Sequence, residues 1–121
     1  MQDLKTIRIL AVDDHEMTTL GYKYILEDSQ FENFNVRVEI AKSYDIGKQK
    51  IEFSSRSLRY DIILLDIQLF SLQSEDPRTG VDLGILARQL VPKSKLVSVD
   101  SCRYNYITNI PLTALVADSY M

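Results

Sequence analysis

Three carboxylates in this sequence stand directly after two apolar segments, a placement that suits a cation site. Asp13 and Asp14 follow residues 7–12, and Asp66 follows the unbroken aliphatic run 62–65. A short continuous apolar run is typical of a strand buried on both faces, as in a parallel sheet beneath helices. The carboxyl ends of parallel strands share one edge of the sheet, where open α/β sheets bind their ligands. If the two strands are neighbours, we expect the three carboxylates to converge within a few ångströms in one acidic pocket.

The chemistry that suits such a pocket is the binding of a hard cation. Clustered carboxylates repel one another, so they require either a cation or raised pKa values. Oxygen ligands favour Mg²⁺, which proteins typically hold with one or two carboxylates, waters and phosphate oxygens. A Mg²⁺ site beside a carboxylate nucleophile is the apparatus for forming an aspartyl phosphate. The competing hypothesis is that Asp13 and Asp14 are solvated loop residues, and the position of Asp66 after a second buried strand favours the site.

Two other side chains with reactive chemistry are expected to play plain structural roles. His15 follows the acids at the start of a predicted helix, and we expect a solvent-facing polar residue rather than a metal ligand beside three oxygens. Cys102 is expected to be a small buried hydrophobic residue, because nothing near it in the sequence clearly activates the thiol.

Hydrophobic periodicity predicts strands and helices in alternation around these acids. Strand patterns cover residues 6–12, 36–40, 60–65 and 95–99. Residues 36–40 alternate apolar and charged side chains, which indicates a half-exposed strand at a sheet edge. Helical spacing follows each strand, with predicted faces at Met17, Leu20, Gly21, Tyr24 and Ile25, at Tyr44, Gly47 and Ile51, at Leu83, Leu86, Ala87, Leu90 and Val91, and in a short helix at 103–110. The order β-α-β-α-β-α-β-α predicts an α/β fold with a parallel sheet and helices on both faces.

The length, composition and charge of the chain limit the classes of protein to which it can belong. The chain has 121 residues, enough for one domain, with 45% hydrophobic and 26% charged residues, as is ordinary for a globular domain. No apolar run approaches the ~20 residues that span a bilayer, and the N-terminus lacks the order of a signal peptide. The single cysteine excludes an internal disulfide and fits a cytoplasmic location. The net charge of -3, without a Lys/Arg stripe, argues against nucleic-acid binding by this segment, and no membrane association is expected.

Five motifs, taken in order, resemble the receiver domain of bacterial two-component response regulators. They are residues 12–15 (Val-Asp-Asp-His) with Gly21, 61–66 (Asp-Ile-Ile-Leu-Leu-Asp), 80–84 (Gly-Val-Asp-Leu-Gly), 92–97 (Pro-Lys-Ser-Lys-Leu-Val) and 117–120 (Ala-Asp-Ser-Tyr). The first is most similar to the subfamily that carries a helix-turn-helix DNA-binding output domain. The resemblance covers residues 1–121 as one receiver domain. It implies a flavodoxin-like, doubly wound parallel sheet of strand order 2-1-3-4-5 in three α/β/α layers, cut short before the last helix.

The resemblance also implies roles for the acids. Asp66 would be the phosphoacceptor. Asp14 and Asp66 would ligate Mg²⁺ directly, together with the backbone carbonyl of Gln68, and Asp13 would act mainly through a bound water.

The C-terminal part departs from the family pattern. The family's phosphoryl-binding Ser/Thr falls on Asp100, by strand phase, or on Ser101, by counting back from Tyr120. With Tyr120 as the family's switch aromatic, the family's Lys falls just past Met121. A rival alignment puts Ala117 in the Lys position.

The function implied is that of a switch rather than an enzyme with a separate substrate. The domain would accept a phosphoryl group on Asp66 from a sensor histidine kinase and control a C-terminal DNA-binding domain outside this segment, with homodimer formation allowed. One alternative is a degenerate receiver that mediates protein contacts without phosphorylation, motivated by Asp100 and the missing Lys. A small phosphohydrolase with an aspartyl nucleophile ranks last, because Gln68 stands where such families carry a second acid.

Overall fold

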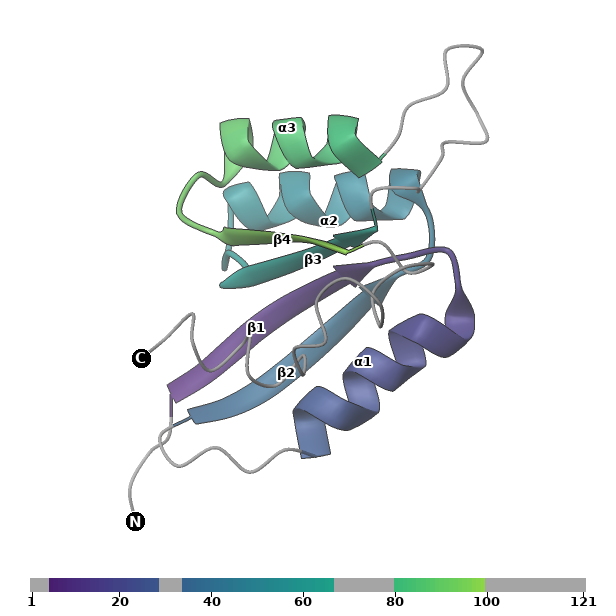
Figure 1. The fold of residues 1–121 in the computed structure, drawn as a ribbon. Coiled ribbons are helices and arrows are strands. Elements are labelled where there is room, and N and C mark those ends of the chain that lie inside the picture. The colour runs from purple at the N-terminus through teal and green to yellow at the C-terminus, as the bar shows by residue number, and fades with distance from the viewer. Residues whose placement is uncertain (1–4, 29–33, 67–79, 100–121) are drawn as a thin grey trace.

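Four parallel strands form one sheet in the order β2-β1-β3-β4 in the computed structural model, which describes residues 5–28, 34–66 and 80–99 (Figure 1). The strands are β1 (Lys5–Val12), β2 (Phe34–Ala41), β3 (Ile62–Asp66) and β4 (Lys95–Val99). Helix α1 (Glu16–Asp28) connects β1 to β2, α2 (Tyr44–Ser55) connects β2 to β3, and α3 (Gly80–Leu90) precedes β4. The predicted α/β class and parallel sheet are confirmed over these residues.

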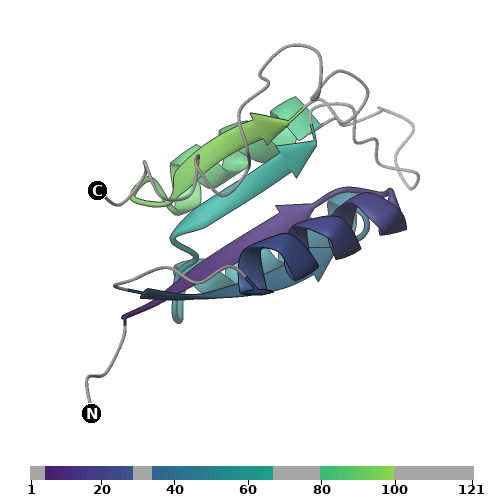
Figure 2. The same ribbon diagram turned by 60° about the horizontal axis from the view of Figure 1, so that its bottom comes forward.

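Helices cover both faces of the sheet, as predicted. Of the described helices, α1 covers one face, and α2 and α3 cover the other (Figures 1 and 2). On β1, Ile7, Ile9 and Ala11 pack towards α1, whereas Leu10 and Val12 pack towards α2 and α3. This alternation is the period-two geometry of a strand that is buried on both faces. The predicted fifth strand and the predicted helix 103–110 lie outside the described residues.

The register of the sheet brings the ends of β1 and β3 to the same level. Val12 of β1 lies opposite Leu65 of β3, so the chain continues into Asp13 and Asp66 side by side. On the other side of β1, Val12 lies opposite Ala41, the last residue of β2, and the Asp13 N–H donates to the Ala41 carbonyl at 3.0 Å. Strand β1 is therefore fixed between two neighbours up to the residue where the acids begin.

Helix α1 forms where the sequence predicts it, but the predicted face is wrong. Met17 and Tyr24 are 82% and 64% exposed, and Ile25 is also exposed. The buried residues are Thr19, Tyr22 and Leu26, which face the sheet. Thr19 can occupy the core because its hydroxyl donates to the Glu16 carbonyl at 2.9 Å, so burial leaves no unsatisfied polar group.

Helix α2 buries the face that its weak signal indicated: Tyr44, Gly47 and Ile51. The helix begins at an N-cap, because the Ser43 side chain accepts a hydrogen bond from the Ile46 N–H at 3.1 Å. Gly47 permits a close approach to β1, since a Cβ built there would lie 2.9 Å from Val12 Cγ1. Helix α2 therefore packs tightly over the strand that carries Asp13.

Helix α3 has most of its predicted face in the core. Leu83, Ala87 and Val91 are buried and Leu86 packs against the same cluster, but Leu90 is 38% exposed. The helix ends at Leu90, in agreement with the predicted stop at Pro92. Among the described residues, none of the helices combines the length and the apolar character needed to cross a membrane.

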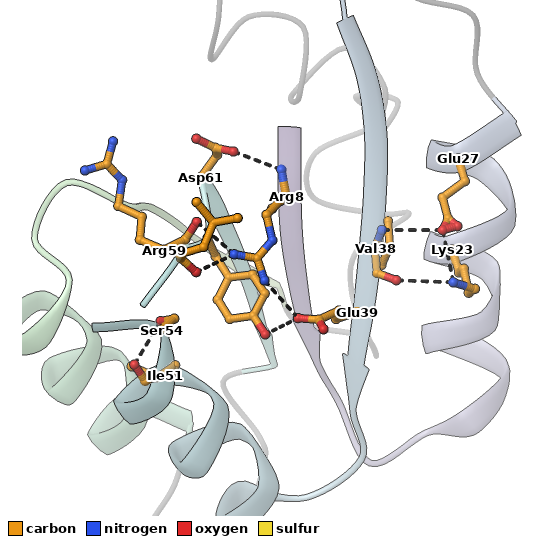
Figure 3. Close-up of polar contacts among 11 residues, drawn as sticks. Arg8, Lys23, Glu27, Val38, Glu39, Ile51, Ser54, Arg59 and Asp61 are labelled. Atoms are coloured by element: carbon orange, nitrogen blue, oxygen red, sulfur yellow. Dashed lines mark hydrogen bonds and ion pairs between the residues drawn. The ribbon is translucent and has the colours of Figure 1, made fainter. Parts of the chain in front are cut away.

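Polar side chains join β1, β2 and the segment before β3 on the α2 side of the sheet (Figure 3). The Arg8 guanidinium lies 4.8 Å from the centre of the Tyr60 ring and 3.6 Å from Glu39 Oε2, and the Tyr60 hydroxyl donates to Glu39. Burial, followed by the hydrogen bond to Glu39, raises the pKa of the Tyr60 hydroxyl, so it stays protonated as a donor. The Arg8 N–H donates to Asp61 Oδ2 at 2.9 Å, which satisfies a backbone group of β1 before the β3 ladder begins.

Candidate metal centre

The acids predicted to converge do converge. Asp13 directly follows β1, and Asp66 is the last residue of β3. These two carboxylates, with Asp14 and His15, offer one ligand atom each, and the four atoms lie within 4.8 Å of one another. Asp13 and Asp66 are buried, at 1% and 2% exposure, while Asp14 and His15 are exposed. The cluster is therefore buried at Asp13 and Asp66 and open to solvent at Asp14 and His15.

A short turn between β1 and α1 sets the position of Asp14 and His15. The His15 N–H donates to Asp13 Oδ1 at 2.8 Å, so an aspartate side chain accepts from the backbone two residues later. The His15 carbonyl accepts from the Thr19 N–H at 3.1 Å, which starts the hydrogen-bond pattern of α1. The helix thus begins immediately beside the acids.

The His15 ring brings a nitrogen into the cluster, although its side chain is 59% exposed. Nδ1 lies 2.8 Å from Asp13 Oδ1, 3.0 Å from Asp14 Oδ1 and 4.0 Å from Asp66 Oδ2. The hydrogen bond with Asp13 raises the pKa of His15, and the negative charges of Asp14, Asp13 and, least, Asp66 raise it further, whereas desolvation opposes the rise. His15 is exposed, as predicted, but its ring also bonds to Asp13, a contact that the sequence did not reveal.

The donor set fits a divalent cation. Asp13 Oδ2 is buried and accepts no hydrogen bond from the described residues, so a cation would provide a partner for a buried charged oxygen. The carboxylate oxygens of Asp13, Asp14 and Asp66 are the ligand type that Mg²⁺ prefers. Of the predicted site residues, Gln68, Asp100, Ser101 and Tyr120 lie outside the described residues, as does the Ala117 of the rival alignment.

Comparison with known proteins gives no relative for this chain. It matches no protein-family model, no curated protein and no solved structure.

Proposed function

We propose that this chain is a phosphoacceptor switch of the receiver type, which takes up a phosphoryl group on Asp66 in the presence of Mg²⁺. The observation that carries the proposal is the meeting of buried Asp13 and Asp66 at the carboxyl ends of two paired parallel strands. Open α/β sheets bind ligands at this edge, beside the strand where the order of connections reverses. Here that strand is β1, between β2 and β3.

Each acid has a distinct part in this proposal. Asp14 and Asp66 would hold Mg²⁺ together with the Gln68 carbonyl, and Asp13 would contribute through a bound water. Bound Mg²⁺ supplies positive charge that offsets the negative charge of the incoming phosphoryl group. An Asp66 oxygen forms a bond to phosphorus while the bond from phosphorus to the donor's imidazole nitrogen breaks. The burial of Asp66 limits the access of water to the resulting acyl phosphate.

The signalling partners follow from the same proposal. A sensor histidine kinase supplies the phosphoryl group, and a DNA-binding domain C-terminal to this segment receives the signal. Tyr120 acts as the switch aromatic, with Asp100 or Ser101 at the phosphoryl-contacting position.

Intact mass spectrometry after incubation with acetyl phosphate and Mg²⁺ tests this function. The expected result is the gain of one phosphoryl group by the wild-type chain, and none by Asp66→Asn or by wild type in excess EDTA. Asp61→Asn is a matched control, because Asp61 precedes the same strand at its other end and should leave phosphorylation intact. An equal gain of mass by Asp66→Asn would contradict the assignment of the phosphoacceptor.

A degenerate receiver that works without phosphorylation is the second candidate, and one observation favours it. The His15 ring already lies within 2.8 Å of Asp13 Oδ1 and 3.0 Å of Asp14 Oδ1, and these acids raise its pKa, which favours the charged form that offsets acid repulsion without a metal. Under this alternative, wild type gains no phosphoryl mass at any Mg²⁺ concentration, and the His15 contacts persist when Mg²⁺ is added.

A further inference from the structure

We infer that His15 is a direct ligand of the ion in the acidic cluster, which gives the site a preference for a divalent first-row transition metal over Mg²⁺. The inference rests on the proposed function only in placing a divalent cation among the same carboxylates. It changes the class of cofactor, because the donor set becomes one imidazole nitrogen with carboxylate oxygens rather than oxygens alone.

The distances around His15 Nδ1 suit an octahedral ion. With bonds of about 2.1 Å, adjacent ligands of an octahedron lie about 3.0 Å apart and opposite ligands about 4.2 Å apart. Nδ1 lies 2.8 Å and 3.0 Å from oxygens of Asp13 and Asp14, and 4.0 Å from Asp66 Oδ2. Nδ1 therefore lies at about the distance of an adjacent ligand from the oxygens of Asp13 and Asp14, and at about the distance of an opposite ligand from Asp66 Oδ2.

A second observation points to a ligand at this place. The Asp13 side chain is 1% exposed, and its Oδ2 accepts no hydrogen bond from the part of the chain that the structure describes. A buried charged oxygen is normally satisfied by a donor or an ion. An ion among these four side chains would contact this carboxylate.

The backbone holds His15 ready for coordination. Its N–H is bonded to Asp13 Oδ1 and its carbonyl to the Thr19 N–H, so the residue is fixed on both sides. The ring turns one nitrogen into the cluster while the side chain remains 59% exposed. An ion can therefore replace the contact between Nδ1 and Asp13 Oδ1 without a movement of the main chain.

The types of ligand atom then decide which ion binds with higher affinity. Imidazole suits Zn²⁺, Ni²⁺, Co²⁺ and other first-row ions, whereas Mg²⁺ prefers oxygen. A nitrogen at this position should raise the affinity for transition ions and contribute little to Mg²⁺ binding.

Pulsed EPR of bound Mn²⁺ tests for the metal–nitrogen bond directly. The chain contains a single histidine, so an untagged preparation carries a single imidazole. The expected result is a ¹⁴N coupling of a directly bound imidazole in wild type that is lost in His15→Gln. Asp14→Asn is the control for location, because it should weaken Mn²⁺ binding by removing another ligand of the same ion.

Calorimetric titrations of Co²⁺ and Mg²⁺ provide the matching affinities. Loss of even an indirect contact to a metal typically weakens binding 10–100-fold, so His15→Gln should weaken Co²⁺ binding by at least about tenfold. Mg²⁺ binding should stay nearly unchanged. The inference is overturned if wild type shows no ¹⁴N coupling, if Asp14→Asn leaves Mn²⁺ binding intact, or if His15→Gln weakens both ions equally. A wild type that shows the coupling but gains no phosphoryl group would support His15 ligation while removing the proposed function.

Discussion

Asp13 Oδ1 accepts hydrogen bonds from both the backbone N–H and the ring of His15, so one buried oxygen organises the turn after β1. The same carboxylate carries a second oxygen with no donor among the described residues. Oδ1 therefore holds His15 beside the acids through two hydrogen bonds.

The His15 ring should be protonated more readily in the metal-free protein than an ordinary histidine. In metal-free protein, NMR titration of the only histidine should give a pKa above 6.5, because the Asp13 hydrogen bond and the nearby acids favour the imidazolium. Stability from this contact should be fully present below the unfolded pKa and lost as the pH rises through the raised folded value. Asp13→Asn should lower the folded pKa. A wild-type value at or below 6.5 would show that the ring does not bond to the acids in solution.

Neutralising Asp13 should stabilise the metal-free protein at alkaline pH. Once His15 is neutral, Asp13 and Asp66 are two buried carboxylates in one cluster, and Asn can still accept the His15 N–H. We expect Asp13→Asn to raise the free energy of unfolding by about 1 kcal/mol in EDTA. Asp14→Asn, at an exposed acid, should change it less. Urea denaturation checks both, and a less stable Asp13→Asn would mean that its charge is needed for the turn.

At this scale the sequence predicted the meeting of the acids but not the position of the imidazole. Convergence follows from strand ends in a parallel sheet, which hydrophobic runs reveal. The orientation of His15 depends on one turn that is closed by Asp13, and the available signal was an Asp three residues before the start of a helix.

The helices differ in how firmly the sequence specifies their buried faces. The burial of Leu83, Ala87 and Val91 was predicted correctly, because the apolar side chains in this segment recur at helical spacing on one face. In α1 the most apolar stripe is exposed, and Thr19 and Tyr22 are buried instead. The pattern of apolar residues alone does not show that the Thr19 hydroxyl is satisfied within its own helix, which allows Thr19 to be buried.

The two glycines in α1 and α2 allow a matched test of helix packing. A Cβ at Gly47 would lie 2.9 Å from Val12 Cγ1 and 3.1 Å from Leu83 Cδ2, so Gly47→Ala should destabilise the fold by about 1–3 kcal/mol. A Cβ at Gly21 meets nothing within 4 Å, so Gly21→Ala should stabilise it by about 0.5–1 kcal/mol through helix propensity. Thermal unfolding of the two variants measures both changes in stability. Similar effects of the two substitutions would contradict the close approach of α2 to β1.

The edge strand β2 is covered by an ion pair from α1, as Figure 3 shows. Lys23 Nζ lies 3.0 Å from Glu27 Oε1 and donates to the Val38 carbonyl at 3.3 Å, while the Val38 N–H donates to Glu27 at 3.5 Å. These contacts occupy backbone groups that an open edge would present to another strand.

Replacement of both Lys23 and Glu27 by Ala should therefore expose the Val38 backbone. Hydrogen exchange of the Val38 amide should accelerate, and self-association through the edge should rise with concentration. The pair Lys48→Ala and Glu52→Ala, on α2, is the control for lost charge. An unchanged Val38 exchange rate would show that the ion pair does not protect the edge.

At the scale of the described sheet, the strand order β2-β1-β3-β4 determines which strand ends lie side by side. It places β1 between its neighbours, so that the acids after β1 and β3 meet at one edge. The sequence predicted this order through a resemblance, and the described strands agree with its first four positions. Asp100, Ser101 and Tyr120 lie beyond β4, where the sequence pattern is weakest, and their roles stay predictions.

The most direct test of the central claim is to locate the phosphoryl group. After incubation with acetyl phosphate and Mg²⁺, borohydride reduction converts an aspartyl phosphate to homoserine, which peptide mass spectrometry assigns to a residue. The expected result is homoserine at position 66, dependent on Mg²⁺ and strongly reduced in Asp14→Asn. Modification at another acid, or none at position 66 with saturating Mg²⁺ in folded protein, would contradict it.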